Sequence, residues 1–129
     1  MTKAELFRAY LQAEGYVPRI DEDGDVVFKA EGLTYILFGA EDDPEYFRLA
    51  IPNFWPIEDD EERLRVLVAA AAVTAQMKVA KVQVIRDNVW ASVEMFVDPI
   101  ENFTRVFPRS LRTLQATVRE FREAMQIRH

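Results

Sequence analysis

The chain has 129 residues, of which 50% are hydrophobic and 29% charged, and it carries a formal net charge of −6. This composition predicts one globular domain spanning residues 1–129 with an ordinary core. The acidic balance argues against binding to nucleic acid or to an anionic membrane surface, since phosphate groups attract concentrated Lys and Arg. The chain has no Cys and its single His is His129, which excludes thiol chemistry, a His-bearing catalytic triad and a multi-histidine metal site.

The first residues predict no signal peptide, because Lys3, Glu5 and Arg8 interrupt any apolar run there. The longest nearly apolar run, Val66–Ala75, is too short to cross a bilayer. We therefore expect a cytoplasmic protein.

Thr2 and Glu5 form a capping-box pattern that predicts a helix ending at Gly15. Residues 25–30 and 33–38 then alternate as two strands of a hairpin around Glu31-Gly32.

A third strand is predicted from about Tyr46 to Ile51, with Phe47, Leu49 and Ile51 on one face. Pro52 follows it and either stops the strand or marks it as an edge strand, because proline cannot donate to a ladder. An edge strand can accept an added strand from an extended polypeptide.

The second helix is predicted from Asp59 or Asp60 to about Met77, and it is apolar on two sides. One face carries Leu64, Leu67, Val68, Ala71 and Ala75, and the nearly opposite face carries Val66, Ala70, Val73 and Met77. A helix that is apolar on two sides is normally covered on both. The second cover is either another helix of this chain or a second subunit in an isologous contact. We take Val66, Ala70, Val73 and Met77 as the candidates for a homodimer interface.

Residues 79–97 predict a second hairpin with a two-residue turn at Asp87-Asn88, since Asn tolerates the left-handed backbone. This turn sets Lys81 opposite Glu94 and Ile85 opposite Trp90.

The last helix is predicted to open with Asp98 as N-cap and Pro99 at its first position. An apolar stripe from Phe103 to Met125 keeps one helical phase, and Pro108 within it predicts a kink or a break. The predicted order is α-β-β-β-α-β-β-α, which indicates a two-layer α+β fold with an antiparallel sheet.

Three acidic segments could suggest metal or acid–base chemistry. Asp21–Asp25 begins like a calcium loop, but its glycine and its twelfth position do not fit the EF-hand pattern. Glu41–Asp43 and Glu58–Glu62 fall in a loop and at a helix start, where solvent exposure and the helix dipole explain them. We therefore predict no catalytic residue, no metal site and no cofactor.

Phe54-Trp55 and Trp90 are the large apolar residues placed in or near loops. They either cover an edge of the core or anchor a partner, since Trp is enriched at binding hot spots. We take Phe54, Trp55 and Trp90 as candidates for partner binding.

The element order, the acidic composition, the Val-Gln-Val…Val-Trp-Ala-Ser-Val-Glu hairpin and the long final helix resemble the YbjN family, which shares the fold of type III secretion chaperones. The resemblance covers about Ala4–Met125. It implies a cytoplasmic dimer with the second helix near the dimer contact and without catalytic residues. The chaperone branch implies binding of extended peptide segments, and the YbjN branch implies a regulatory role.

Two functions are therefore considered. The first is a non-catalytic, dimeric protein-binding module with a chaperone or regulatory role. The second is a small carboxylate-based enzyme or metal-binding domain.

Overall fold

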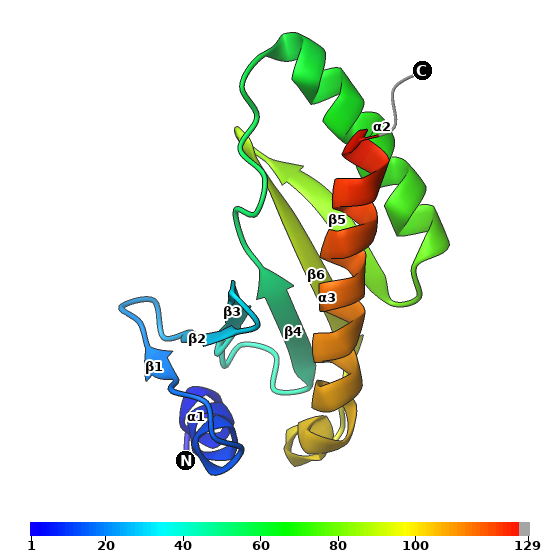
Figure 1. Cartoon of the computed structure of the whole chain (residues 1–129). Helices are drawn as coiled ribbons and strands as arrows, with labels where there is room; N and C mark the ends of the chain where they lie inside the picture. The colour runs from blue at the N-terminus through cyan, green and yellow to red at the C-terminus, as the bar shows by residue number, and fades with distance from the viewer. Residues whose placement is uncertain (127–129) are drawn as a thin grey trace.

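A six-stranded antiparallel sheet, in the order β1-β2-β3-β4-β6-β5, forms one layer of the molecule (Figure 1). The computed structural model describes residues 1–126, so His129 lies outside the described residues. The elements are α1 (Lys3–Ala13), β1 (Arg19–Ile20), β2 (Val26–Ala30), β3 (Leu33–Leu37), β4 (Tyr46–Ile51), α2 (Asp60–Gln76), β5 (Ala80–Ile85), β6 (Asn88–Phe96), a 3₁₀ turn (Ile100–Asn102) and α3 (Phe103–Gln126). This confirms the predicted α+β class and element order and adds the short strand β1.

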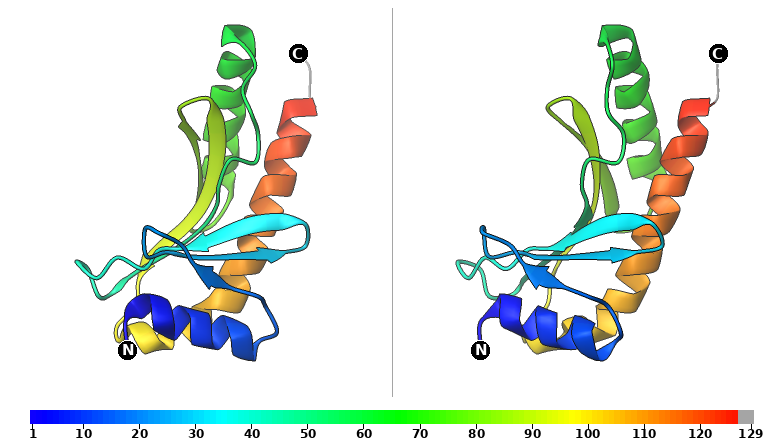
Figure 2. Two further views of the ribbon diagram at one scale, coloured as in Figure 1. Left: turned by 90° about the vertical axis from the view of Figure 1, so that its left-hand side faces the viewer. Right: turned by 60° about the vertical axis from the view of Figure 1, so that its left-hand side comes forward.

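The three helices lie against the same face of the sheet (Figure 2). Aromatic side chains of α1, the sheet and α3 meet in the centre of the core. Phe7 contacts Phe103 with ring centroids 4.7 Å apart, and Phe28 stacks on Tyr35 at 5.2 Å. Among residues 1–126, no helix lies on the other face of the sheet, and we call it the open face.

The local predictions for the first half of the chain are confirmed. Thr2 and Glu5 form the capping box of α1, and Gly15 follows the helix with φ +93°. The turn between β2 and β3 is Glu31-Gly32, both in the left-handed region, and it sets Phe28 opposite Tyr35 as expected.

Strand β4 lies inside the sheet, so the prediction of an edge strand is wrong. It pairs with β3, where Ile36 lies opposite Ala50 and Leu37 opposite Leu49, and with β6 along its whole length. Pro52 comes directly after the last paired residue of β4, where its missing N–H removes no ladder hydrogen bond. A proline at that position therefore does not distinguish an edge strand from a central one.

The hairpin of β5 and β6 has the predicted strands in a different register. Its turn is Arg86-Asp87, with Arg86 at φ 57° and Ile85 opposite Asn88. Every pair is displaced by two residues from the prediction, which leaves each side chain on its predicted face. Lys81 therefore still forms an ion pair with Glu94, now from a diagonal position.

The side chain of Asn88 explains the displacement, because it forms hydrogen bonds with residues outside the turn. Its Oδ1 accepts hydrogen bonds from the backbone N–H of Trp55 at 3.1 Å and from that of Val89 at 2.9 Å. Asn88 thus starts β6 and ties the loop after β4 to the hairpin.

Helix α3 begins after the 3₁₀ turn, so Asp98 is not its N-cap and the predicted start is wrong. The helix continues through Pro108 without a break. Pro108 is the sixth residue of α3, so the hydrogen bond it omits belongs to the carbonyl of Thr104 in the first turn.

Candidate interaction surface

Helix α2 buries one face against β5 and α3. Val66, Ala70 and Val73 are 0%, 5% and 2% exposed, and half-buried Met77 packs on the same cluster. Their neighbours in this cluster are Val82 and Val89 of the sheet and Phe121 and Met125 of α3.

The prediction that Val66, Ala70, Val73 and Met77 form a dimer contact is therefore wrong, because the chain itself covers them. The β5–β6 hairpin and the end of α3 converge on this face from two directions. Helical periodicity identified the face but carried no information about which elements would cover it.

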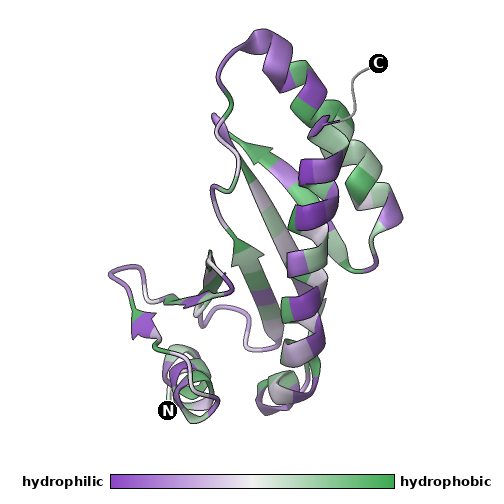
Figure 3. Cartoon of the chain, viewed as in Figure 1, coloured by the Kyte–Doolittle hydropathy of each residue, from purple (hydrophilic) through white to green (hydrophobic). Residues whose placement is uncertain are grey.

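The opposite face of α2 is exposed. Leu64, Leu67 and Val68 are 67%, 48% and 72% exposed, and Ala71 and Ala75 are exposed beside them. Figure 3 shows hydrophobic residues recurring along α2 among hydrophilic ones. We call Leu64, Leu67, Val68, Ala71 and Ala75 the α2 strip. Single exposed leucines are common on protein surfaces, but a continuous apolar strip marks an interaction site.

Phe54 and Trp55 lie at the edge of the core. Their rings meet Phe121 of α3 edge-on, with centroid distances of 5.4 Å and 5.6 Å. The loop that carries them is held by a hydrogen bond from the N–H of Phe54 to the carbonyl of Val89, at 3.0 Å. These contacts favour the core-edge interpretation of Phe54 and Trp55 over partner binding.

Trp90 lies on the open face and is half-buried. Its indole N–H donates to Oδ1 of Asn53 at 3.0 Å, and the guanidinium carbon of Arg48 lies 5.9 Å from its ring centroid. Trp90 remains available for contact, and it is separated by the sheet from Trp55.

Within residues 1–126, neither edge strand of the sheet, β1 or β5, has a long row of backbone groups free to pair with another strand. Strand β1 has two residues, and β5 is blocked at its middle by a side chain of α2. The N–H of Val82 donates to Oγ1 of Thr74 at 2.8 Å, where an added strand would have to bind. A side chain that occupies an edge in this way protects it from pairing with other chains.

Replacing Thr74 by Val is expected to lower the free energy of unfolding by about 1–2 kcal/mol, because it leaves the N–H of Val82 without its acceptor. Amide hydrogen exchange should become faster at Val82. Thr117→Val is the matched control, since that hydroxyl donates to the carbonyl of Thr113 and its loss orphans no N–H. Equal stability losses in urea unfolding of the two variants would show that Thr74 does not protect the edge.

A polar network crosses the open face between β4, β6 and β5. The Tyr46 hydroxyl donates to Glu94, which also pairs with Lys81. Burial and the hydrogen bond to Glu94 raise the pKa of Tyr46 to about 12. Burial alone would raise the pKa of Glu94, but the hydrogen bonds from Lys81 and Tyr46 and the charges of Lys81 and Arg48 lower it overall. Glu94 therefore stays ionised and is held by its neighbours.

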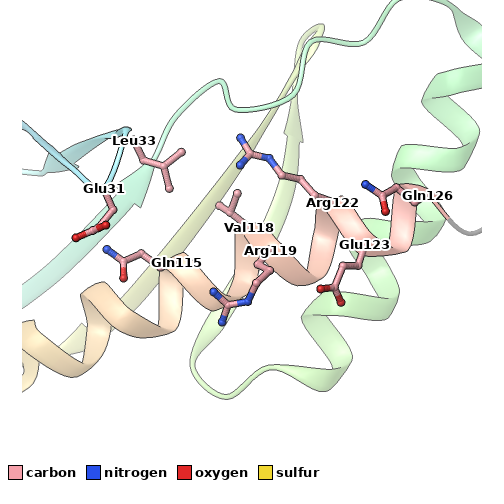
Figure 4. Close-up of a pocket in the computed structure, with 8 residues that line it drawn as sticks. All are labelled: Glu31, Leu33, Gln115, Val118, Arg119, Arg122, Glu123 and Gln126. Carbon is pink, nitrogen blue, oxygen red and sulfur yellow. The ribbon is translucent and has the colours of Figure 1, made fainter.

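A hollow of about 600 Å³ lies between the β2–β3 turn and α3. Figure 4 shows Arg119 and Glu123 extending from one side of α3 and Arg122 from another, with Leu33 and Glu31 across the gap. These charged groups do not converge on a common point, so the hollow has no arrangement suited to catalysis.

The acidic clusters have structural roles. Oδ1 of Asp21 accepts from the N–H groups of Asp23 and Asp25, and Oδ1 of Asp59 caps α2 through the N–H of Glu62. Within residues 1–126, no group of three or more Asp, Glu, His or Cys side chains is placed to hold a metal ion. None of the helices described here has the length and apolarity needed to cross a membrane.

Comparison of the chain with known proteins finds no matching family model, no matching curated protein and no matching solved structure. The resemblance to the YbjN family stays a prediction. The α2 strip places three large exposed apolar side chains, Leu64, Leu67 and Val68, side by side on one helix face.

Proposed function

We propose that this protein is a non-catalytic, cytoplasmic protein-binding module that acts as a homodimer, in a chaperone or regulatory role. The observation that carries the proposal is the α2 strip, an exposed apolar face on a helix whose other face is in the core. Burying this strip against a second copy removes apolar surface from water. The structural roles of the acidic residues support the non-catalytic part.

The strip is self-complementary in size when two copies of α2 pack antiparallel. A two-fold axis between Val68 and Ala71 sets Leu64 opposite Ala75 and Val68 opposite Ala71, so a large side chain meets a small one at each position. Such alternation of large and small residues lets two helices approach closely. The two helix dipoles also oppose each other in this arrangement.

The ends of the strip are complementary in charge. Glu61 is exposed in the first turn of α2, and exposed Lys78 lies two residues beyond the last helical residue, Gln76. Antiparallel packing brings the end of one α2 that carries Glu61 near the end of the other that precedes Lys78, twice per dimer. A single copy of the chain thus supplies both halves of the contact, as an isologous interface requires.

Sedimentation of the wild-type protein at micromolar concentration is expected to give a dimer, and Val68→Glu is expected to give a folded monomer. The strip has five residues, fewer than the roughly 20–30 per side of a standard interface, so we expect a micromolar dissociation constant. Val17→Glu is the control, since it makes the same substitution at a residue that is 89% exposed and lies outside α2. A wild-type monomer at about 100 μM would rule out the dimer.

Charge reversal tests the antiparallel arrangement itself. Glu61→Lys and Lys78→Glu should each weaken the dimer by about 1 kcal/mol, since each change affects two rim pairs of modest strength. The double variant, or a mixture of the two single variants, should recover the dimer. Absence of recovery would place the two helices in another orientation.

The two edges of the sheet are poor sites for a partner strand. Within residues 1–126, β1 is too short and β5 is blocked by Thr74, so an extended protein segment finds no free strand edge of useful length. The proposed protein-binding role is therefore assigned to side chains of the open face, where Trp90 remains half-exposed.

A further inference from the structure

A hollow of about 430 Å³ opens on the open face, where the start of α1 meets the ends of β3, β4 and β6. Phe38, Tyr46 and Phe96 give it apolar walls, and Phe96 is 76% exposed. Lys3 and Arg48 supply two cations at its lining. The hollow thus combines aromatic surface with two cations and with the two carboxylates of Asp42 and Asp43.

Arg48 has no acceptor for its hydrogen-bond donors among residues 1–126. Its guanidinium carbon lies 4.5 Å from the ring centroid of Phe38, and its Nε is sealed from solvent without a partner. Glu94, the residue directly across the ladder, is engaged by Lys81 and Tyr46 instead. A guanidinium keeps its charge in proteins, so Arg48 presents a cation that stacks on Phe38 and feels the charge of Glu94 without a hydrogen bond to it.

Lys3 is also without a carboxylate partner in the described part of the chain. Its side chain donates to the backbone carbonyls of Ala40 at 3.3 Å and Asp43 at 3.1 Å, and the residue is 6% exposed. These bonds fix the ammonium group at the rim of the hollow. The charges of Glu41, Asp42 and Asp43 act on this ammonium group, so Arg48 is the cation left for an anion that enters the hollow.

We propose that this hollow binds a monocarboxylate attached to an apolar group, with Arg48 holding the carboxylate and Phe38 and Phe96 contacting the apolar part. The planar guanidinium matches a carboxylate through two parallel hydrogen bonds. Asp42 and Asp43 also line the hollow, so it disfavours a doubly charged phosphate more than a single negative charge. This proposal is independent of the dimer, because none of the lining residues belongs to α2.

The test is a titration of the full chain with phenylpropionate, followed by heteronuclear NMR of the arginine Nε–H and tryptophan indole signals. We expect saturable shifts at Arg48 and Trp90 in the millimolar range, as suits a ligand of this size. Phenylpropionamide has the same shape without the charge, and should bind at least about tenfold more weakly. A short peptide ending in Phe, with a free or an amidated terminus, distinguishes a chain end from a free acid as the source of the carboxylate.

Arg48→Gln and Arg48→Lys should each weaken binding at least about tenfold, because neither offers the planar fork. Arg63→Gln is the matched control, since Arg63 already pairs with Asp87 at 2.5 Å. If Arg48→Gln does not fold, the wild-type titration decides by itself. No saturable shift by about 20 mM phenylpropionate overturns the proposal, as do equal affinities for the amide or for inorganic phosphate.

Discussion

Val73→Glu is expected to unfold the protein or to lower its free energy of unfolding by more than about 4 kcal/mol. Val73 is 2% exposed in a cluster of apolar side chains that includes Val82 and Phe121, which cannot pair with a new carboxylate. An unpaired charge in such a site must either stay buried at high cost or open the packing between α2 and the sheet. Since small domains have about 5–15 kcal/mol of stability, this loss is a large part of the total.

The matched control is Val68→Glu on the exposed face of the same helix. It introduces the same side chain five residues earlier, at a position that is 72% exposed, and should keep the native circular dichroism spectrum. Urea unfolding of both variants at equal concentration measures the difference. Similar midpoints for Val73→Glu and the wild type would show that this face of α2 is not in the core.

Trp55→Ala is expected to lower the free energy of unfolding by about 2–4 kcal/mol, which corresponds to roughly 10 °C in the melting temperature. The indole packs on Phe121 at 5.6 Å, beside Phe54, and its removal leaves a gap between the loop after β4 and α3. Trp55→Phe should recover most of the loss, because a ring remains against Phe121.

The result also decides between the two interpretations of this loop. A melting temperature unchanged by Trp55→Ala would show that the indole contributes little to the core and is free for a partner. The hydrogen bond from the N–H of Trp55 to Asn88 is made by the backbone, so it persists in the variant and does not obscure the comparison.

The elements whose signals are local could be predicted from the sequence. The capping box of Thr2 and Glu5 and the Glu31-Gly32 turn each act within a few residues and are found as expected, and α2 begins at Asp60, within the predicted Asp59 or Asp60. The alternation along β4 and the stripe along α3 also follow from periodicity alone. The α+β class with an antiparallel sheet came from the order of these elements.

How these elements meet depends on contacts between residues far apart in the sequence. Asn88 suits a turn on local grounds, but its side chain binds the backbone of Trp55 from a distant loop and shifts the hairpin by two residues. Because side chains on a strand repeat every two residues, the pattern of polar and apolar pairs allowed both registers.

The sequence pattern also left open where β4 lies in the sheet and which face of α2 the rest of the chain covers. Both apolar faces of α2 satisfy the helical period, and the choice between them depends on where α3 and the β5–β6 hairpin converge. Arg48 gave no sequence signal, since it is one polar residue on an alternating strand. The pairing of β3 with β4 places Arg48 against Phe38. Lys81 and Tyr46 bind Glu94, so within residues 1–126 this carboxylate does not accept a hydrogen bond from Arg48.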